Sequence, residues 1–407
     1  MATQAQDFRP GDPMETNANL MGQKGDNVRL VMSDRFGPSW HRMEKLHKLR
    51  PDEHWTAVQA LEEADLDFEV RTVASPPVPD PFQAGKYIEA PKTIFIVRSP
   101  LRDDPRSVVF GHATEGWTPI QNRTIAELLD KTGLTRDYPV ETMGALGEGE
   151  TLFASLFAGS SDVVGEEYAK FIGITDGKAA NRSLTLFIGG QRMYCQNTVR
   201  LATSGAEWTI SLRHDAEVET NLHLAMQAIG DVKARFNAYD AAMDVLAHKK
   251  IATKTRQAIL EFAYPDPRPP AKVRISQQLA SRLNGYENMT EANREALLAA
   301  ESKYEAWKRT IAGHREVADT RINVFEQEFP QFGGTTYAVL QGIAEVESWR
   351  KSNKSGPKGD DQIATGLLFG DRALTLLRAA VACQRVAGVP VDSRYRKLEA
   401  SAPSVRN

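Results

Sequence analysis

The chain has 407 residues, of which 41% are apolar and 25% are charged, and its formal net charge is −3. A chain of this length is longer than a single hydrophobic core usually serves, so we expect a globular protein with more than one domain. No run approaches the roughly 18 apolar residues that span a bilayer, and residues 1–25 lack the apolar segment of a secretory signal, which predicts a cytoplasmic protein without membrane contact. The two cysteines, Cys195 and Cys383, lack metal-type spacing, so neither a disulfide framework nor a zinc site is expected.

The first half of the chain is predicted to contain an antiparallel sheet. Residues 1–35 are polar and aperiodic, which is typical of a flexible arm. A helix is expected at about 55–66, with Thr56 as its cap, and a second at 123–133, ending at Gly133. Runs rich in Ile, Val, Phe and Thr predict strands at 92–99, 107–114, 151–159, 168–175 and 183–195. Short connectors between most of these strands favour antiparallel hairpins.

The second half is predicted to be helical. Apolar residues recur every three or four positions from about 217, and further helical runs follow at 290–328, 335–352 and 366–388. We therefore predict an α+β protein: a mainly antiparallel sheet domain at 36–230, followed by a mostly α-helical C-terminal half at 231–390. A flexible tail is expected at 391–407.

Charge is segregated along the chain. Residues 52–69 carry seven acidic residues and no Lys or Arg, whereas residues 245–282 carry eight basic residues and two acidic ones. Residues 178–214 carry five basic residues against Glu207 alone. This pattern fits either a phosphate backbone or a complementary surface on another copy of the chain, and it predicts a homo-oligomer. Solvated helix and strand faces are the simpler alternative.

The segment "QRMYCQNTVRLA", residues 191–202, combines a predicted strand ending at Cys195 with two amides and a predicted helix start. Gln196 and Asn197 could cap that helix, or they could line a nucleic-acid groove together with Arg192 and Arg200. Cys195 could be a buried core residue or, if the fold brings His214 to it as a base, a nucleophile.

Further candidates come from an aromatic residue and from the basic segments. Trp117, in "GWTPIQN", could be a core ring or a stacking platform for an unpaired base. The segment "GALGEGE", residues 144–150, lacks the Lys of a phosphate-binding loop and is interpreted as a hairpin turn. The predicted nucleic-acid contacts are Arg182, Arg192, Gln196, Asn197, Arg200, Trp117, Lys249, Lys250 and Lys254.

Several ordered motifs carry a family resemblance. They include "PSWHRM", "VETMGALGEGETLFASLFAG", "QRMYCQNTVRLA" and "GTTYAVLQGIAEVESWR", spread over roughly residues 36–388. With them the chain resembles a phage- and plasmid-borne family with a domain of unknown function, the DUF932 family. The family pattern has an Asn-Ser-His-Asp-Gly loop where this chain has "GITDGKAANRS", and an Asp-His pair where it has "ESWRKS". A histidine-based metal or acid–base site at those places would therefore be lost here.

The resemblance implies a protein of mobile DNA, located in the host cytoplasm if phage-encoded. Together with the basic segments and the predicted sheet, it favours single-stranded nucleic-acid binding or strand annealing in recombination. A non-enzymatic host-interaction or defence-evasion protein is an alternative, and a Cys-dependent enzyme is a second one. Because no segment holds a complete set of nucleophile, base and orienting group, no catalytic residue, metal or cofactor is assigned.

Overall fold

The computed structural model describes residues 30–33, 47–49, 54–102, 104–178, 183–192, 198–199, 209–228, 232–271, 273–274, 278, 281, 289–349, 371–391 and 395–403. The chain divides into two compact units. The first comprises Met1–Asp244 with Ser348–Leu374, and the second comprises Val245–Glu347 with Thr375–Asn407.

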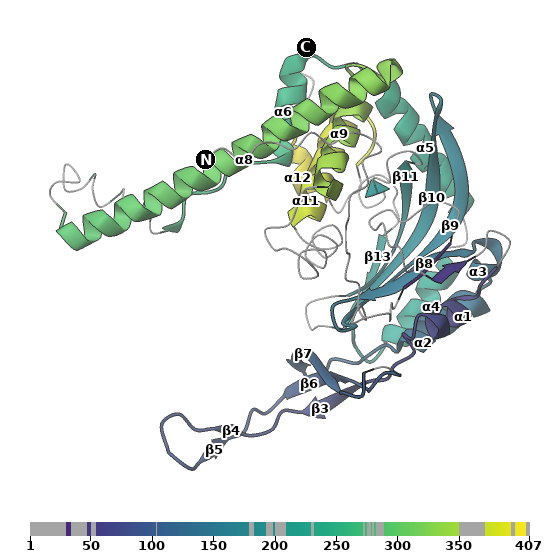
Figure 1. Cartoon of the computed structure of the whole chain (residues 1–407), viewed down its shortest axis with the longest axis vertical. Helices are drawn as coiled ribbons and strands as arrows, with labels where there is room; N and C mark the ends of the chain where they lie inside the picture. Colours follow the sequence, from purple (N-terminus) through teal and green to yellow (C-terminus); the bar gives the residue numbers. More distant parts are fainter. Residues whose placement is uncertain are drawn as a thin grey trace. The chain divides into compact units, whose positions relative to one another are not determined.

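The first unit is built on an eight-stranded sheet, whose long middle strands are seen in Figure 1. Its path is β12-β11-β10-β9-β8-β1-β2, and β13 also pairs with β11. All neighbouring strands are antiparallel except β1 and β2. The strands are β1 (Leu30–Ser33), β2 (His47–Leu49), β8 (Val140–Leu146), β9 (Thr151–Val163), β10 (Glu166–Gly177), β11 (Leu184–Arg192), β12 (Thr198–Val199) and β13 (Thr209–Leu212).

Helices cover one face of this sheet. They are α1 (Ala57–Glu63), α2 (Asn122–Lys131), α3 (Leu134–Asp137), α4 (Val218–Ala228) and α5 (Val232–His248). Leu61 of α1, Leu129 of α2 and Leu222 of α4 are fully buried in one core with Ile172 of β10 and Leu186 of β11. Alternate strand residues supply the sheet side of this core, as the period of two requires.

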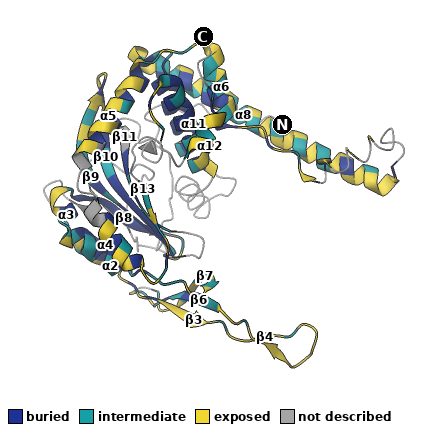
Figure 2. Ribbon diagram, turned by 180° about the vertical axis from the view of Figure 1, so that it is seen from behind, coloured by how far each residue is buried: buried dark blue, intermediate teal, exposed yellow. Residues whose placement is uncertain are grey.

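A smaller antiparallel sheet, ordered β3-β6-β7, extends from the same unit. Its strands are β3 (Val70–Ala74), β6 (Thr93–Arg98) and β7 (Val108–Thr114), and a two-stranded ribbon of β4 (Val78–Pro79) and β5 (Tyr87–Ile88) continues beyond β3 and β6. We call residues 70–98 the arm. Figure 2 shows the ribbon at its end largely in the colour of exposed residues.

The second unit is helical. Its elements are α6 (Thr253–Ala263), α8 (Glu291–Glu328), the 3₁₀ helix η3 (Pro330–Phe332), α9 (Thr336–Trp349), most of α11 (Asp371–Ala387) and α12 (Arg396–Ser401). Stacked and tilted rings of Phe325, Phe332 and Tyr337 join α8, η3 and α9. Along the described residues, no helix has both the length and the apolar composition that crossing a bilayer requires.

The predicted α+β class is confirmed. Thr56 forms a capping box with Gln59 at the start of α1, and α2 ends just before Gly133, which has a φ of 78°. The "GALGEGE" segment is the β8–β9 hairpin, where Leu146 pairs with Thr151. Two elements lie inside segments expected to be flexible: β1 pairs with β8, and α12 forms near the C-terminus.

Candidate nucleic-acid interface

The junction at residues 191–202 is only partly described. Gln191 and Arg192 end β11, and Gln191 pairs with Thr198 of β12. The prediction that a helix begins after Asn197 is therefore wrong at Thr198–Val199, because these two residues form a short strand. Both residues are β-branched, and β-branched side chains favour the pleated conformation over a helix. The residues Arg182, Cys195, Gln196, Asn197 and Arg200 lie outside the described part of the chain, as does the side chain of Arg192.

Trp117 lies at the edge of the first unit's core. Its ring is half-buried and stacks on His214, with centroids 4.9 Å apart and planes 22° apart. One face of the indole is therefore already occupied by an imidazole. A base could reach only the rest of the ring, so the predicted role of Trp117 as a stacking platform stays a prediction.

His214 belongs to a buried polar cluster with Asp176 and Lys178. His214 Nε2 lies 2.9 Å from Asp176 Oδ1, and its Nδ1 lies 3.2 Å from the carbonyl oxygen of Thr118. The Lys178 ammonium donates to the other oxygen of Asp176 and to the carbonyl oxygen of Ile120. The side chains of Asp176 and Lys178 are fully buried. This cluster ties the segment before α2 to the ends of β10 and β13.

The partners of Asp176 favour its charged form. Burial alone raises the pKa of this carboxyl, but the Lys178 ammonium and His214 outweigh burial, so its pKa lies below the ordinary value. His214 was predicted as a possible base for Cys195, whereas in the structure its acidic neighbour is Asp176. Asp176 and His214 lie far apart in the sequence, so no local pattern indicated this pair.

The predicted lysine contacts lie at the junction of α5 and α6. Lys254 is exposed, Lys249 is half-buried, and the Lys250 ammonium donates to the carbonyl oxygen of Gly333. In the same basic segment, Arg256 donates to Asp319 of α8 at 2.7 Å. Several charges of this segment therefore stabilise the second unit, whereas Lys254 forms no ion pair within the described residues.

The face of the large sheet opposite the helices carries a row of phenylalanines that sequence analysis missed. Phe157 of β9 pairs directly with Phe171 of β10, and their ring centroids are 6.1 Å apart. Phe153 lies on the same side of β9, and Phe187 occupies that side of β11 because it pairs with Gly173. We call these four residues the aromatic face.

Small residues lie between the rings of the aromatic face. Ser155 and Gly173 face each other in the register, as do Phe171 and Gly189. The Phe187 ring lies over Gly173, where a Cβ atom would come within 2.2 Å of it. Phe157, Phe171 and Phe187 are half-buried, and Phe153 is buried. The three half-buried residues keep some exposed surface, and all four phenylalanines also have further interactions within the chain.

A second polar cluster joins α5 to the far end of the β9–β10 hairpin. Asp240 accepts hydrogen bonds from Tyr168 and Ser161, and it pairs with Lys170 at 3.2 Å. Burial, followed by the nearby Tyr239 and Asp240, raises the pKa of Tyr168. The Ser161 hydroxyl donates to Asp240 and accepts from Lys170 at 2.6 Å, so its proton is directed at a carboxylate already paired with an ammonium. This arrangement anchors a helix and does not resemble an activated nucleophile.

The thiol of Cys383 is fully buried in α11, and burial raises its pKa. A buried thiol with a raised pKa is a poor nucleophile at neutral pH. Within the described residues, no group of His, Cys, Asp and Glu side chains is arranged to hold a metal ion.

A family model described as "Domain of unknown function (DUF932)" matches residues 109–362. The chain belongs to this family. The DUF932 match begins in β7 and includes the whole β8–β13 part of the large sheet, with the aromatic face and the Asp176 cluster. It begins after the arm. Neither the curated proteins nor the solved structures contain a match to the chain.

Proposed function

We propose that this DUF932 protein binds single-stranded nucleic acid, with unpaired bases stacking on the aromatic face. The observation that carries the proposal is the register of β9, β10 and β11, which places four phenylalanines on one side of three adjacent strands. Aromatic residues on a sheet surface are a common platform for unpaired bases, since every base has a π face. Each stacked base contributes roughly 1–3 kcal/mol.

The small residues beside the rings support this use of the surface. Bases need room to lie flat, and Gly189 and Ser155 carry little or no side chain beside the phenylalanines, whereas the space at Gly173 is filled by the Phe187 ring. By contrast, the helix-covered side of the same strands is filled by aliphatic residues such as Ile172 and Leu186. The two faces therefore differ in a way that core packing alone does not require.

The phosphate contacts in this proposal come from the arginines around β11 and β12. Arg192 ends β11, and Arg182 and Arg200 flank the two strands in the sequence. Guanidinium groups suit this role because one group can donate to two phosphate oxygens at once. Lys178 does not contribute a phosphate contact in this proposal, because its ammonium is buried against Asp176.

The biological role that we attach to this binding is DNA metabolism, with strand annealing during recombination as the specific case. Stacking on phenylalanine is tolerant of sequence, which suits a protein that must accept any single strand. Arginines that contact phosphates then supply affinity that falls as salt rises.

The experiment measures the binding of a fluorescently labelled single-stranded oligonucleotide by anisotropy at two salt concentrations. Changing both Phe157 and Phe171 to Leu keeps their apolar character but removes the π face, so we expect affinity to fall at least about tenfold. Changing both to Tyr keeps the rings and should leave most of the affinity. A purely structural role would predict the opposite preference at these half-buried positions.

The matched control is Phe110, a half-buried ring on β7 of the smaller sheet, whose centroid lies 6.2 Å from that of Phe68. Phe110→Leu removes a ring of similar surroundings away from the aromatic face and should leave oligonucleotide affinity unchanged. Equal affinity in the wild type and the Leu double variant would refute the stacking site. Absence of any salt-dependent binding by the wild type would refute nucleic-acid binding altogether.

A further inference from the structure

The arm exposes more apolar surface than its size can stabilise alone. Phe82, between β4 and β5, is 92% exposed, and Tyr87 of β5 is 69% exposed. Val73, Val78 and Ile88 are also exposed. An isolated two-stranded ribbon is only marginally stable in water, and clustered exposed apolar residues mark interaction surfaces. The arm is therefore built to be covered by a partner.

The charge of the arm favours a protein partner over nucleic acid. Arg98 is buried and pairs with Asp104, and Arg71 pairs with Glu69. The other charges of the arm are two basic and two acidic residues: Lys86, Lys92, Asp80 and Glu89. A surface that contacts phosphates needs a basic excess, and the arm has none to offer beyond its paired arginines.

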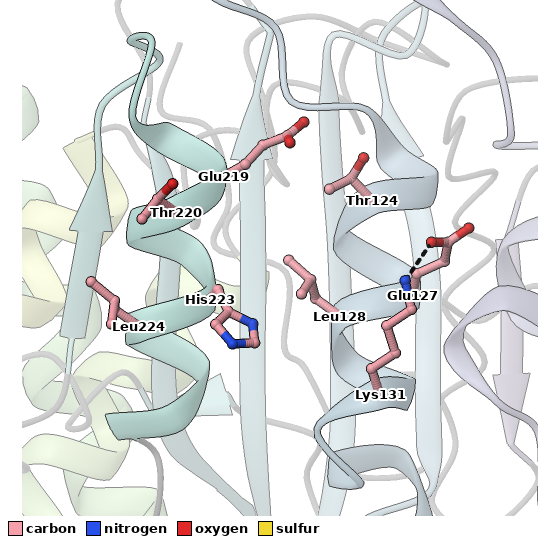
Figure 3. Close-up of a pocket in the computed structure, with 8 residues that line it drawn as sticks. All are labelled: Thr124, Glu127, Leu128, Lys131, Glu219, Thr220, His223 and Leu224. Carbon is pink, nitrogen blue, oxygen red and sulfur yellow. Dashed lines mark hydrogen bonds and ion pairs between the residues drawn. The ribbon is translucent and has the colours of Figure 1, made fainter.

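We call the segment between β4 and β5, which carries Phe82, the tip of the arm. The same unit contains a groove that suits an exposed aromatic side chain. It lies between α2 and α4, has a volume of about 390 Å³, and exposes Leu128 and Leu224 between polar residues (Figure 3). Leu224 is 56% exposed. Glu219 lies near one end of the groove and forms no ion pair within the described residues. The lining thus combines two leucines with a carboxylate that forms no ion pair within the described residues.

We propose that the arm of one chain docks on a second copy of this chain, with Phe82 inserted between α2 and α4 of that copy. The aromatic ring would cover the two leucines of the groove, and Lys86, which is exposed near the tip, would lie near Glu219. The ribbon extends away from α2 and α4 of its own chain (Figure 1). Tip and groove are different surfaces, so each chain can both give and receive a contact, and the assembly is a ring or a filament.

Two single variants and their mixture test this geometry by light scattering after gel filtration. Phe82→Asp removes the tip and leaves the groove, whereas Leu224→Asp removes the groove and leaves the tip. We expect each variant alone to be monomeric, with its association weakened at least about tenfold. Mixed in equal amounts, the two should form a heterodimer and nothing larger, because only one tip–groove contact can then form.

Leu298 provides a matched control, since it lies on α8, carries the same side chain and is also 56% exposed. Leu298→Asp should assemble like the wild type. Circular dichroism and the thermal midpoint of each variant establish folding, and no loss is expected because the substituted side chains are exposed. As a second measurement, Phe82→Cys and Leu224→Cys chains should form a disulfide-linked pair when mixed and oxidised, whereas Phe82→Cys and Leu298→Cys chains should not.

Three results would overturn the proposal. They are a wild type that is monomeric at every concentration, variants that assemble as the wild type does, and a mixture in which no heterodimer appears. A Leu224→Asp variant that still associates with itself, while Phe82→Asp does not, would indicate that arms pair with arms.

Discussion

The two sheets of the first unit are made of similar residues but have different surroundings. In the large sheet, Ile172 and Leu186 are fully buried under helices, whereas β3 of the arm is exposed from Arg71 to Ala74. Both sheets are mainly antiparallel and rich in β-branched and aromatic residues. Local composition therefore decides that a segment is extended, but helices from distant parts of the chain decide whether it is buried.

The same contrast exists between the two sides of the large sheet. Its helix-covered side buries the charged Asp176 cluster together with an aliphatic core, and its other side carries the aromatic face. Substitutions on the covered side should therefore cost mainly stability. Substitutions that remove a half-buried ring from the aromatic face should cost mainly binding.

The largest loss of stability is expected for Asp176→Asn. This substitution leaves the buried Lys178 ammonium without its counter-charge, which costs about 3–5 kcal/mol when one partner of a buried pair is removed. Thermal or urea unfolding followed by circular dichroism measures the effect. The exposed pair of Arg136 and Asp137 serves as a control, and Asp137→Asn should change stability little.

The same carboxyl predicts how stability depends on pH. Because the pKa of Asp176 is lower in the folded state than in the unfolded one, its contribution is complete above the unfolded value of about 3.9 and is lost as the pH falls toward the folded value. Acid unfolding of Asp176→Asn should therefore show a smaller dependence on pH below about 4 than the wild type does. Identical slopes for the two proteins would contradict this assignment.

The next largest loss of stability is expected for Gly173→Ala. Its comparison with Gly111→Ala contrasts glycines in the two sheets. A Cβ at Gly173 would meet the Phe187 ring at 2.2 Å, and forcing the ring to move should cost about 1–3 kcal/mol. Gly111 in β7 has no atom within 4 Å of such a Cβ, so Gly111→Ala should be close to neutral. The difference between the two unfolding midpoints is the measurement. If Phe187 belongs to the binding surface, Gly173→Ala should also weaken oligonucleotide binding.

A smaller effect is expected at the start of α1. Thr56 Oγ1 accepts a hydrogen bond from the Gln59 amide at 3.1 Å, and Gln59 Oε1 accepts one from the Thr56 amide at 3.0 Å. Thr56→Ala should cost about 1 kcal/mol. Thr290 also precedes a helix, α8, but its side chain makes no capping hydrogen bond, so Thr290→Ala should cost less. Urea unfolding midpoints separate the two, and equal losses would contradict the capping role.

The fold was largely predictable from the sequence because its signals are local. The cap at Thr56, the turn at residues 144–150 and the periodicity of α8 each depend on neighbouring residues. The aromatic face was not found, because Phe157, Phe171 and Phe187 meet only through strand register, and the bulge between Ala169 and Phe171 shifts that register. A search for phenylalanines at even spacing within a strand, such as Phe153 and Phe157, would have given part of the signal.

The Asp176 cluster was missed for a different reason. Its members come from β10, from the segment after it and from the segment after β13, and no sequence period relates them. His214 was noticed, but as a neighbour of Asp215 in the sequence. Buried charged clusters of this kind become visible only when the strands that carry them are paired.

The smallest effect on stability is expected for the double variant Arg192→Ala and Arg200→Ala, which tests whether these arginines supply phosphate contacts. Removing guanidinium groups that contact phosphate should weaken oligonucleotide binding about equally for all base sequences. The slope of log affinity against log salt should flatten by about one to two phosphate equivalents. The thermal midpoint should stay nearly unchanged. Arg136→Ala on α3 removes an exposed guanidinium elsewhere in the unit and should leave the slope intact. A double variant that loses stability but keeps its salt slope would assign these arginines to the fold and leave the aromatic face without its phosphate contacts.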